Sequence, residues 1–169
     1  MRAVILVENG VQDQEFFFPL YRLEEEGIEV DIASPTIEVR KCKYGIPFQP
    51  NITTDQLLVD DYDLVIVPGG WESPEKIRQD KNSLIFIFLM NKRGKIIASQ
   101  CHGPWVLISA GIMTERKGTC YKGMKDDLIN AGCEYIDTNI VIDKNIITVP
   151  HYRNNPEFMR EIIKCLRTL

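Results

Sequence analysis

Short apolar runs that alternate with helical segments constrain the fold of this chain more than any other feature. The clearest runs are residues 3–7, 63–67 and 95–99. An apolar run without polar alternation is typical of a strand that is buried on both faces. Such strands in alternation with helices predict an α/β fold, with a mostly parallel sheet and helices packed on both faces.

The other segments extend this pattern. Asp13 is a candidate N-cap for a first helix that reaches about residue 26, and Gly27 is suited to end it. Residues 37–51, which include a glycine and two prolines, predict an edge hairpin or an extended excursion. Further strands are expected at residues 28–33, 134–136, 140–142 and 146–149, and further helices at 74–79, 83–92, 105–110, 124–130 and 155–166.

Length and composition indicate one ordinary globular domain over residues 1–169. Hydrophobic residues make up 44% of the chain, charged residues 26%, and the formal net charge is −4. We expect no nucleic-acid partner, because lysine and arginine form no basic cluster. We expect no membrane partner and a cytoplasmic location, because no apolar stretch has the length of a membrane span and no signal peptide is recognisable.

Five cysteines are present, and none forms a C-x-x-C pair. An odd count in a chain expected to be cytoplasmic argues against a disulfide framework. Two histidines without ligand spacing give no reason to expect a metal site, and nothing in the sequence indicates a cofactor. The cysteines are Cys42, Cys101, Cys120, Cys133 and Cys165.

Cys101 has the sequence context of a nucleophile. It lies where a buried strand turns into a helix, with Ser99 and Gly103 in the pattern small-x-nucleophile-x-small. The start of the following helix is expected to lower the pKa of the thiol. The backbone N–H groups of His102 and Gly70 are candidates for an oxyanion hole. In the alternative interpretation, Cys101 is a small buried packing residue.

Histidines and glutamates could complete the chemistry. Ligands of parallel sheets bind at the carboxyl ends of the strands, where the loops 8–15, 68–75 and 100–104 should meet. His102 is adjacent to Cys101 and is a candidate base, with His151 as its rival. Glu15 precedes three phenylalanines, which should raise the pKa of its carboxyl group. Glu75 could orient a histidine, although Glu72 competes for that role.

Four stretches of the chain resemble the PfpI-type intracellular cysteine peptidases of the DJ-1/PfpI family, and the Cys-His-Gly-Pro block at 101–104 is the most specific part. The resemblance implies a flavodoxin-like three-layer sandwich with Cys101 as nucleophile, next to His102 and Glu15. It favours Glu75 over Glu72 as the glutamate that a neighbouring subunit contributes to a Cys-His-Glu site. It therefore implies a homo-oligomer, either a dimer or a hexamer of dimers, with the active site at the subunit interface. We assign Tyr121 to substrate binding. The stretches are residues 18–27, 67–70, 98–104 and 117–132.

Two departures from the family pattern bear on these assignments. Residues 71–73 contain one residue more than the usual loop, which affects where Glu75 lies. The usual Ser-Arg-x-Pro stretch is replaced by residues 149–152, which include His151. This second departure bears on the substrate preference and on the geometry of the oligomer.

These residues predict a cysteine-dependent hydrolase that needs no metal or cofactor. Its substrates would be short peptides, or 2-oxoaldehydes and the glycated products that they form with amines. The site residues are the same in both cases, so they leave peptidase and deglycase or glyoxalase activity open. The alternative is a non-enzymatic thiol sensor of oxidative stress or a chaperone, in which Cys101 is oxidised. A glutamine amidotransferase is less favoured, because Tyr152 and Arg153 follow His151 where that chemistry uses His-x-Glu.

Overall fold

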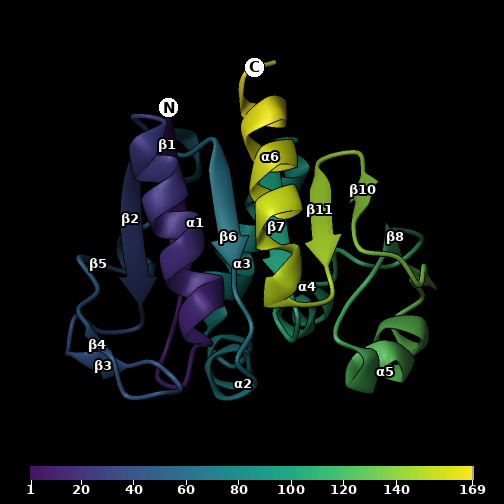
Figure 1. Cartoon of the computed structure of the whole chain (residues 1–169), viewed down its shortest axis with the longest axis horizontal. Coiled ribbons are helices and arrows are strands. Elements are labelled where there is room, and N and C mark those ends of the chain that lie inside the picture. Colours follow the sequence, from purple (N-terminus) through teal and green to yellow (C-terminus); the bar gives the residue numbers. More distant parts are fainter. Residues whose placement is uncertain (169) are drawn as a thin grey trace.

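A computed structural model describes residues 1–168 and contains a seven-stranded central sheet (Figure 1). Neighbouring strands run parallel except at one edge, where β10 is antiparallel to β11. The mostly parallel sheet predicted from the apolar runs is therefore confirmed. In sheet order the strands are β10 (Val141–Asp143), β11 (Ile146–Val149), β7 (Ile96–Gln100), β6 (Leu64–Val67), β1 (Arg2–Leu6), β2 (Glu29–Ser34) and β5 (Ile52–Thr53).

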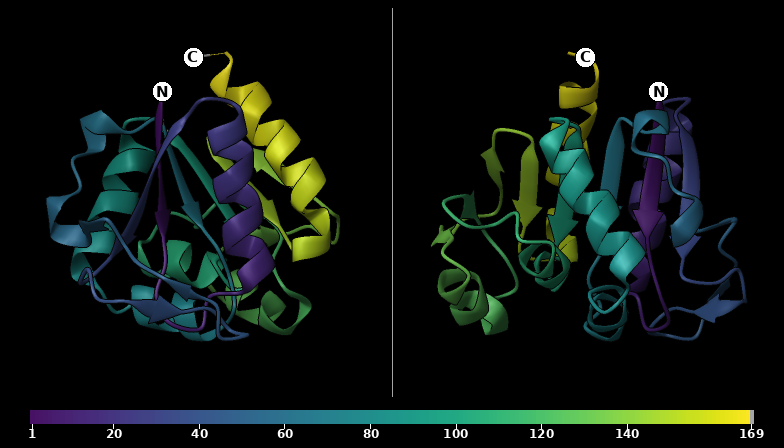
Figure 2. Two further views of the ribbon diagram at one scale, coloured as in Figure 1. Left: turned by 60° about the vertical axis from the view of Figure 1, so that its left-hand side comes forward. Right: turned by 180° about the vertical axis from the view of Figure 1, so that it is seen from behind.

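Helices cover both faces of the sheet and make the outer layers of a three-layer sandwich. Helices α1 (Asp13–Glu25) and α6 (Asn155–Leu166) lie side by side on one face (Figure 1). Helices α2 (Glu72–Ile77), α3 (Lys81–Lys92) and α4 (Pro104–Ser109) lie on the other, and α3 is clearest from behind (Figure 2). Among residues 1–168, no helix is long and apolar enough to cross a membrane.

Two separate cores follow from the alternation of side chains along each buried strand. In β1, Ala3 and Ile5 face the α1 and α6 layer, whereas Val4 and Leu6 face the layer of α2, α3 and α4. All four side chains are at most 1% exposed. Because burial of a Val, Leu or Ile side chain contributes about 1.5–3 kcal/mol, a strand with apolar residues on both faces is stable only in the middle layer.

Two small sheets lie outside the main one. Strands β3 (Arg40–Lys41) and β4 (Pro47–Phe48) form an antiparallel hairpin, as predicted for residues 37–51. Strand β8 (Lys117–Gly118) pairs in parallel with β9 (Glu134–Tyr135), next to α5 (Lys125–Asn130). The strand expected at 134–136 is thus real but does not extend the central sheet. Single 3₁₀ turns are η1 (Thr54–Gln56), η2 (Val59–Asp61), η3 (Lys122–Met124) and η4 (Tyr152–Asn154).

The start of α1 differs from the prediction. Gln12 is the N-cap and Asp13 is the first helical residue, so the expected Asp13 cap is wrong. The Asp13 carboxylate instead accepts a hydrogen bond from the backbone N–H of Tyr44, at 3.1 Å. The contact joins α1 to the β3–β4 hairpin, and a tertiary partner thereby replaces the local cap that Asp13 could have made. Helix α1 ends before Gly27, whose φ is 72°, as predicted.

Candidate active site

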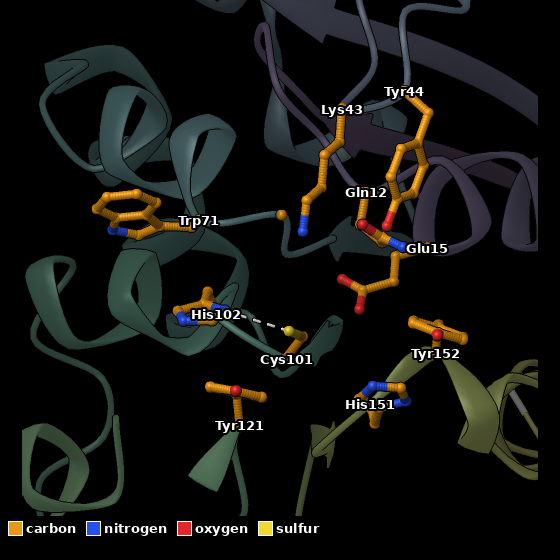
Figure 3. A pocket seen from close by; sticks show the side chains of 11 residues that line it. Gln12, Glu15, Lys43, Tyr44, Trp71, Cys101, His102, Tyr121, His151 and Tyr152 are labelled. Carbon is orange, nitrogen blue, oxygen red and sulfur yellow. Dashed lines mark hydrogen bonds between the residues drawn. The ribbon is translucent and has the colours of Figure 1, made fainter. Parts of the chain in front are cut away.

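The loops that follow β1, β6 and β7 meet at the carboxyl ends of these strands, where the sequence predicted that they would. They surround a cavity of about 480 Å³ (Figure 3). The residues that these three loops contribute to the cavity are Gln12, Glu15, Gly70, Trp71, Cys101 and His102.

Cys101 lies on a sharp turn between β7 and α4. Its φ is 57°, in the left-handed region, and that conformation costs a residue other than glycine about 1–3 kcal/mol. Two backbone hydrogen bonds hold the turn: Cys101 N–H donates to the Val149 carbonyl at 3.0 Å, and Tyr121 N–H donates to the Cys101 carbonyl at 2.9 Å. The backbone thus has the strained strand-turn-helix geometry of the predicted nucleophile elbow.

Glycines allow the chain to pass close to this turn. A Cβ atom on Gly69 would lie 2.7 Å from Cys101 Cβ and 2.6 Å from Glu15 Oε2. A Cβ atom on Gly103 would lie 3.0 Å from the Gln100 carbonyl oxygen and closer still to other atoms. Neither site has room for a side chain, so glycine is required for steric reasons.

The environment of the Cys101 sulfur differs from the prediction. Burial and the neighbouring Glu15 raise the pKa of the thiol, and hydrogen bonds from the backbone N–H groups of His102 and Gly70 lower it by less. The expected depression of the pKa by the helix start is therefore wrong for the chain by itself. The reason is that Cys101 is only 8% exposed and lies beside Glu15. The same two N–H groups are the predicted donors of the oxyanion hole, and that assignment stays a prediction.

Glu15 is fully buried beside Cys101, and its carboxyl group points toward the sulfur (Figure 3). Burial raises its pKa to about 7, against smaller opposing effects of a hydrogen bond from Gly69 N–H (2.7 Å), of Cys101 and of Lys43. The predicted rise is confirmed. A neutral Glu15 carries no charge to oppose a thiolate, so the proton on Glu15 and the proton on Cys101 are coupled.

His102 faces the sulfur, with its Nδ1 3.2 Å from Cys101 Sγ. Its ring stacks on Tyr121 (centroids 4.6 Å apart, 27° between planes) and meets the edge of Trp105 at 5.1 Å. Burial, with a smaller contribution from Lys43, lowers the pKa of the imidazole. A neutral ring in this position is able to accept the thiol proton.

Neither predicted glutamate reaches His102 within one chain. The Glu75 side chain is about half exposed, lies 3.8 Å from Arg78 Nη1 and does not line the cavity. Glu72 pairs with Lys76 at 2.7 Å. Among the hydrogen bonds of residues 1–168, none engages Nε2 of His102. The assignment of Glu75 to a neighbouring subunit therefore stays a prediction.

His151 lies on the opposite side of the cavity from His102 (Figure 3). Its Nδ1 accepts a hydrogen bond from Arg153 N–H at 3.3 Å, which leaves the ring proton on Nε2. Its ring packs on Tyr152, with centroids 4.0 Å apart, and burial lowers its pKa. His151 thus shares the cavity, but its hydrogen bond to the backbone makes it a neighbour of the site and not a partner of Cys101.

Sequence reasoning missed several residues of the cavity. Lys43 and Tyr44 come from the β3–β4 hairpin, which was not expected at the site. Gln12, the N-cap of α1, and Tyr152, in the turn after β11, lie in segments 8–15 and 149–152 that were linked to the site, but neither residue was singled out. For Lys43 and Tyr44 the only local signal was the glycine- and proline-containing excursion at 37–51, which indicated a projecting segment without indicating where it packs.

The chain is similar to known proteins over almost its whole length. Residues 1–165 match the DJ-1/PfpI family. A Pyrococcus furiosus protein named Deglycase PfpI is 40% identical over 167 residues, 99% of this chain and 100% of that one. The putative cysteine protease YraA of Bacillus subtilis is 29% identical over 169 residues, 98% of each chain.

A crystal structure shows the same fold. It is a two-domain protein from Anabaena variabilis with DJ-1/ThiJ/PfpI-like and ferritin-like domains, with a TM-score of 0.96 and 32% identity. The alignment covers 98% of this chain, which spans 50% of the length of that protein. The flavodoxin-like sandwich expected from the sequence is confirmed.

Proposed function

The chain belongs to the DJ-1/PfpI family, and on this premise we propose that it is a cysteine-dependent hydrolase in which Cys101 attacks a small carbonyl electrophile. The observation that supports this best is the position of Cys101 Sγ, 3.2 Å from His102 Nδ1 on a strained turn with two backbone N–H groups at the sulfur. A nucleophile of this geometry, at the wall of a cavity and next to a neutral base, has the arrangement required for covalent catalysis.

Activation of the thiol requires the neighbouring groups. His102 takes the proton of Cys101 and becomes an imidazolium ion, whose charge stabilises the thiolate. Protonated Glu15 contributes no repulsion and is able to donate a hydrogen bond to the sulfur. Because the pKa of the thiol is raised, Cys101 is protonated in the resting state and loses its proton only when His102 accepts it.

An early adduct of a 2-oxoaldehyde with an amine is the electrophile we favour. Its carbinol carbon bears the amine and a hydroxyl group next to a ketone. The thiolate displaces the amine, which leaves with the proton from His102, and a hemithioacetal remains on Cys101. Transfer of hydrogen between its two oxygen-bearing carbons, for which Glu15 is the adjacent proton carrier, gives a thioester. Water cleaves the thioester to a 2-hydroxy acid and restores the thiol. A cavity of about 480 Å³ suits such compounds.

A peptide carbonyl would use the same residues. The thiolate would add to the carbonyl carbon, and the oxyanion would accept hydrogen bonds from His102 N–H and Gly70 N–H. The amine would leave with the proton from His102, and water would hydrolyse the acyl-enzyme. We place this second, because an amide is less electrophilic than an aldehyde adduct and the resting thiol of Cys101 is weakly ionised.

Glu75 is proposed to act across a subunit interface. Its exposed side chain has only the loose 3.8 Å contact with Arg78, and a second copy of the chain would have to bring it to His102. Glu75→Gln should then lower turnover while Glu72→Gln does not. A monomer in solution that is fully active would contradict this part of the proposal.

The first experiment is the alkylation rate of all five cysteines against pH, followed by mass spectrometry on the native protein. If Cys101 alone reacts rapidly and Cys42 stays slow, release of a 2-hydroxy acid from methylglyoxal adducts should follow, and Cys101→Ser should abolish it. If Cys101 stays silent until the protein unfolds, it is a packing residue and the proposal is wrong.

A thiol sensor is the second candidate, and the coupling of Glu15 to Cys101 favours it. A carboxyl group with a pKa of about 7 could donate a hydrogen bond to a sulfinate on Cys101. This function predicts that peroxide oxidises Cys101 selectively and that turnover of every carbonyl substrate is negligible. Turnover that Cys101→Ser abolishes would exclude it as the sole function.

A further inference from the structure

The ammonium group of Lys43 points into the catalytic cavity. The Lys43 side chain extends from the β3–β4 hairpin, and its Nζ lies in the space between Trp71 and Gln12, above Cys101 and His102 (Figure 3). Among residues 1–168, no carboxylate lies within ion-pairing distance of Nζ. Because the pKa of Glu15 is about 7, its carboxyl group is mostly neutral below that pH and does not compensate the charge of Lys43. The positive charge of Lys43 is therefore available to a ligand.

The backbone of Lys43 is held firmly even though the side chain is exposed. Lys43 N–H donates to the Val11 carbonyl at 2.8 Å. At the base of the hairpin, Arg40 forms a buried ion pair with Glu8, with Nε and Oε1 2.8 Å apart and both side chains at most 10% exposed. These contacts fix the hairpin on the loop that follows β1, so the position of the lysine at the cavity is a property of the fold.

The positive region continues beyond the cavity. A second hollow of about 360 Å³ shares Lys43, Gly70 and Trp71 with it and adds Lys41. Lys76 also lines this hollow, but Glu72 neutralises it at 2.7 Å. Among residues 1–168, neither Lys41 nor Lys43 forms an ion pair, so two lysines border these adjoining hollows, and their charge would attract an anionic group on a substrate.

We propose that Lys43 binds an anionic group, a carboxylate or a phosphate, on the carbonyl compound that Cys101 attacks. The inference rests on the proposed function and narrows its substrate class to anionic carbonyl compounds. A single ammonium group acts as a point charge that tolerates either oxyanion. It would favour anionic substrates over neutral ones of the same size, and it would lose that preference when salt screens the charge.

Two reagents of nearly equal size test this directly. Iodoacetate is anionic and iodoacetamide is neutral. In both reactions the thiolate sulfur forms a bond to the CH₂ carbon and iodide leaves. The ratio of their rates at Cys101 is measured at about pH 6, where Glu15 with its pKa of about 7 is mostly protonated, and at low salt in the wild type, Lys43→Gln and Lys43→Arg. Lys92→Gln, on the remote helix α3, is the matched control.

Loss of the Lys43 charge should lower the iodoacetate-to-iodoacetamide ratio about 3- to 10-fold, as expected for one partly screened charge at close range. Lys43→Arg and Lys92→Gln should keep the wild-type ratio, and salt at about 0.5 M should reduce the wild-type ratio toward that of Lys43→Gln. An equal ratio in the wild type and Lys43→Gln overturns the anion site. Failure of Cys101 to react even with iodoacetamide overturns the proposed function instead.

A second arm identifies the oxyanion. Inorganic phosphate and acetate, at equal ionic strength, are compared as protectants of Cys101 against iodoacetamide. Protection by phosphate that disappears in Lys43→Gln supports a phosphate-bearing substrate, and the same result with acetate supports a carboxylate. Protection by both that is unchanged in Lys43→Gln contradicts the assignment of Lys43.

Discussion

The two sides of the catalytic cavity are built in different ways. On the side of the elbow, Gly69, Cys101 and His102 are placed by backbone contacts that leave no room for a single added carbon at Gly69. On the other side, Lys43 and Tyr152 reach the cavity as side chains, from a hairpin and from a 3₁₀ turn. We therefore expect the first side to tolerate little change, and the second side to accept substitutions without disturbing the strands.

This difference separates chemistry from selection. Covalent catalysis depends on the position of the nucleophile to within a fraction of an ångström, and the elbow supplies that through sterics. Selection of a substrate needs only a charge or a ring at the right end of the cavity, and loop side chains are sufficient for that. Substitutions on the elbow side should therefore have large effects, and those on the other side should have graded ones.

The two histidines provide the largest contrast. His102→Ala removes the base at 3.2 Å from the sulfur and should lower kcat/KM about 10²- to 10⁴-fold. His151→Ala should cost less than about 10-fold, because the ring lines the cavity without contacting the sulfur. Both variants are assayed with the same adduct. If only His151→Ala is inactive, the assignment of the base is wrong and an amidotransferase-like chemistry has to be considered.

Gly69→Ala should lower kcat/KM about 10²-fold, the typical cost of a misplacement of catalytic groups by about 1 Å. The added Cβ would meet Cys101 Cβ at 2.7 Å, so the elbow has to move. Gly111→Ala is the control, because its φ of 70° makes alanine strained while no atom lies within 4 Å of the added carbon. The control should lose about 1 kcal/mol of stability and keep its activity. Equal activity of the two variants would show that the elbow can accommodate the added carbon without displacing Cys101.

Glu15 should make the protein less stable as the pH rises from about 4.5 to 7. Its carboxyl pKa is about 7 in the folded protein, against an ordinary value of 4.5, so the folded state holds a proton that the unfolded state has lost in this range. Stability from this group is complete below pH 4.5 and decreases through pH 7 by about 2–4 kcal/mol.

Glu15→Gln removes this titration, and its free energy of unfolding should change less between about pH 5 and pH 8 than that of the wild type. Urea unfolding at the two pH values measures both slopes. Parallel slopes would mean that Glu15 titrates at an ordinary pKa and is not the neutral partner of Cys101.

Tyr121 should show the smallest effect. Its ring stacks on His102 at 4.6 Å, so Tyr121→Ala should lower kcat about 2- to 10-fold through loss of an aromatic pair that holds the imidazole. Tyr121→Phe keeps the ring and should remain near the wild type. If Tyr121→Phe is as impaired as Tyr121→Ala, the hydroxyl group acts on the substrate, as the sequence assignment to substrate binding implies.

Local pattern determined much of this protein. Apolar runs without polar alternation predicted a sheet covered by helices on both faces, because strands with two apolar faces are stable only in such a middle layer. Ser99 and Gly103 around Cys101 predicted the elbow, because a tight turn of this type excludes larger residues. Strand order along the chain then brought Glu15, Gly70 and Cys101 to the same edge, since parallel strands present their carboxyl ends together.

Only the tertiary structure decided the electrostatics and the second side of the cavity. The thiol pKa of Cys101 rises because burial and Glu15 outweigh the hydrogen bonds from the N–H groups of His102 and Gly70, and burial is not a local property of the sequence. Lys43 reaches the cavity because the buried pair of Arg40 and Glu8 docks the hairpin on a loop 32 residues earlier in the chain. Contacts between residues so far apart in the sequence follow from the packing of the whole chain, and the local sequence pattern does not predict them.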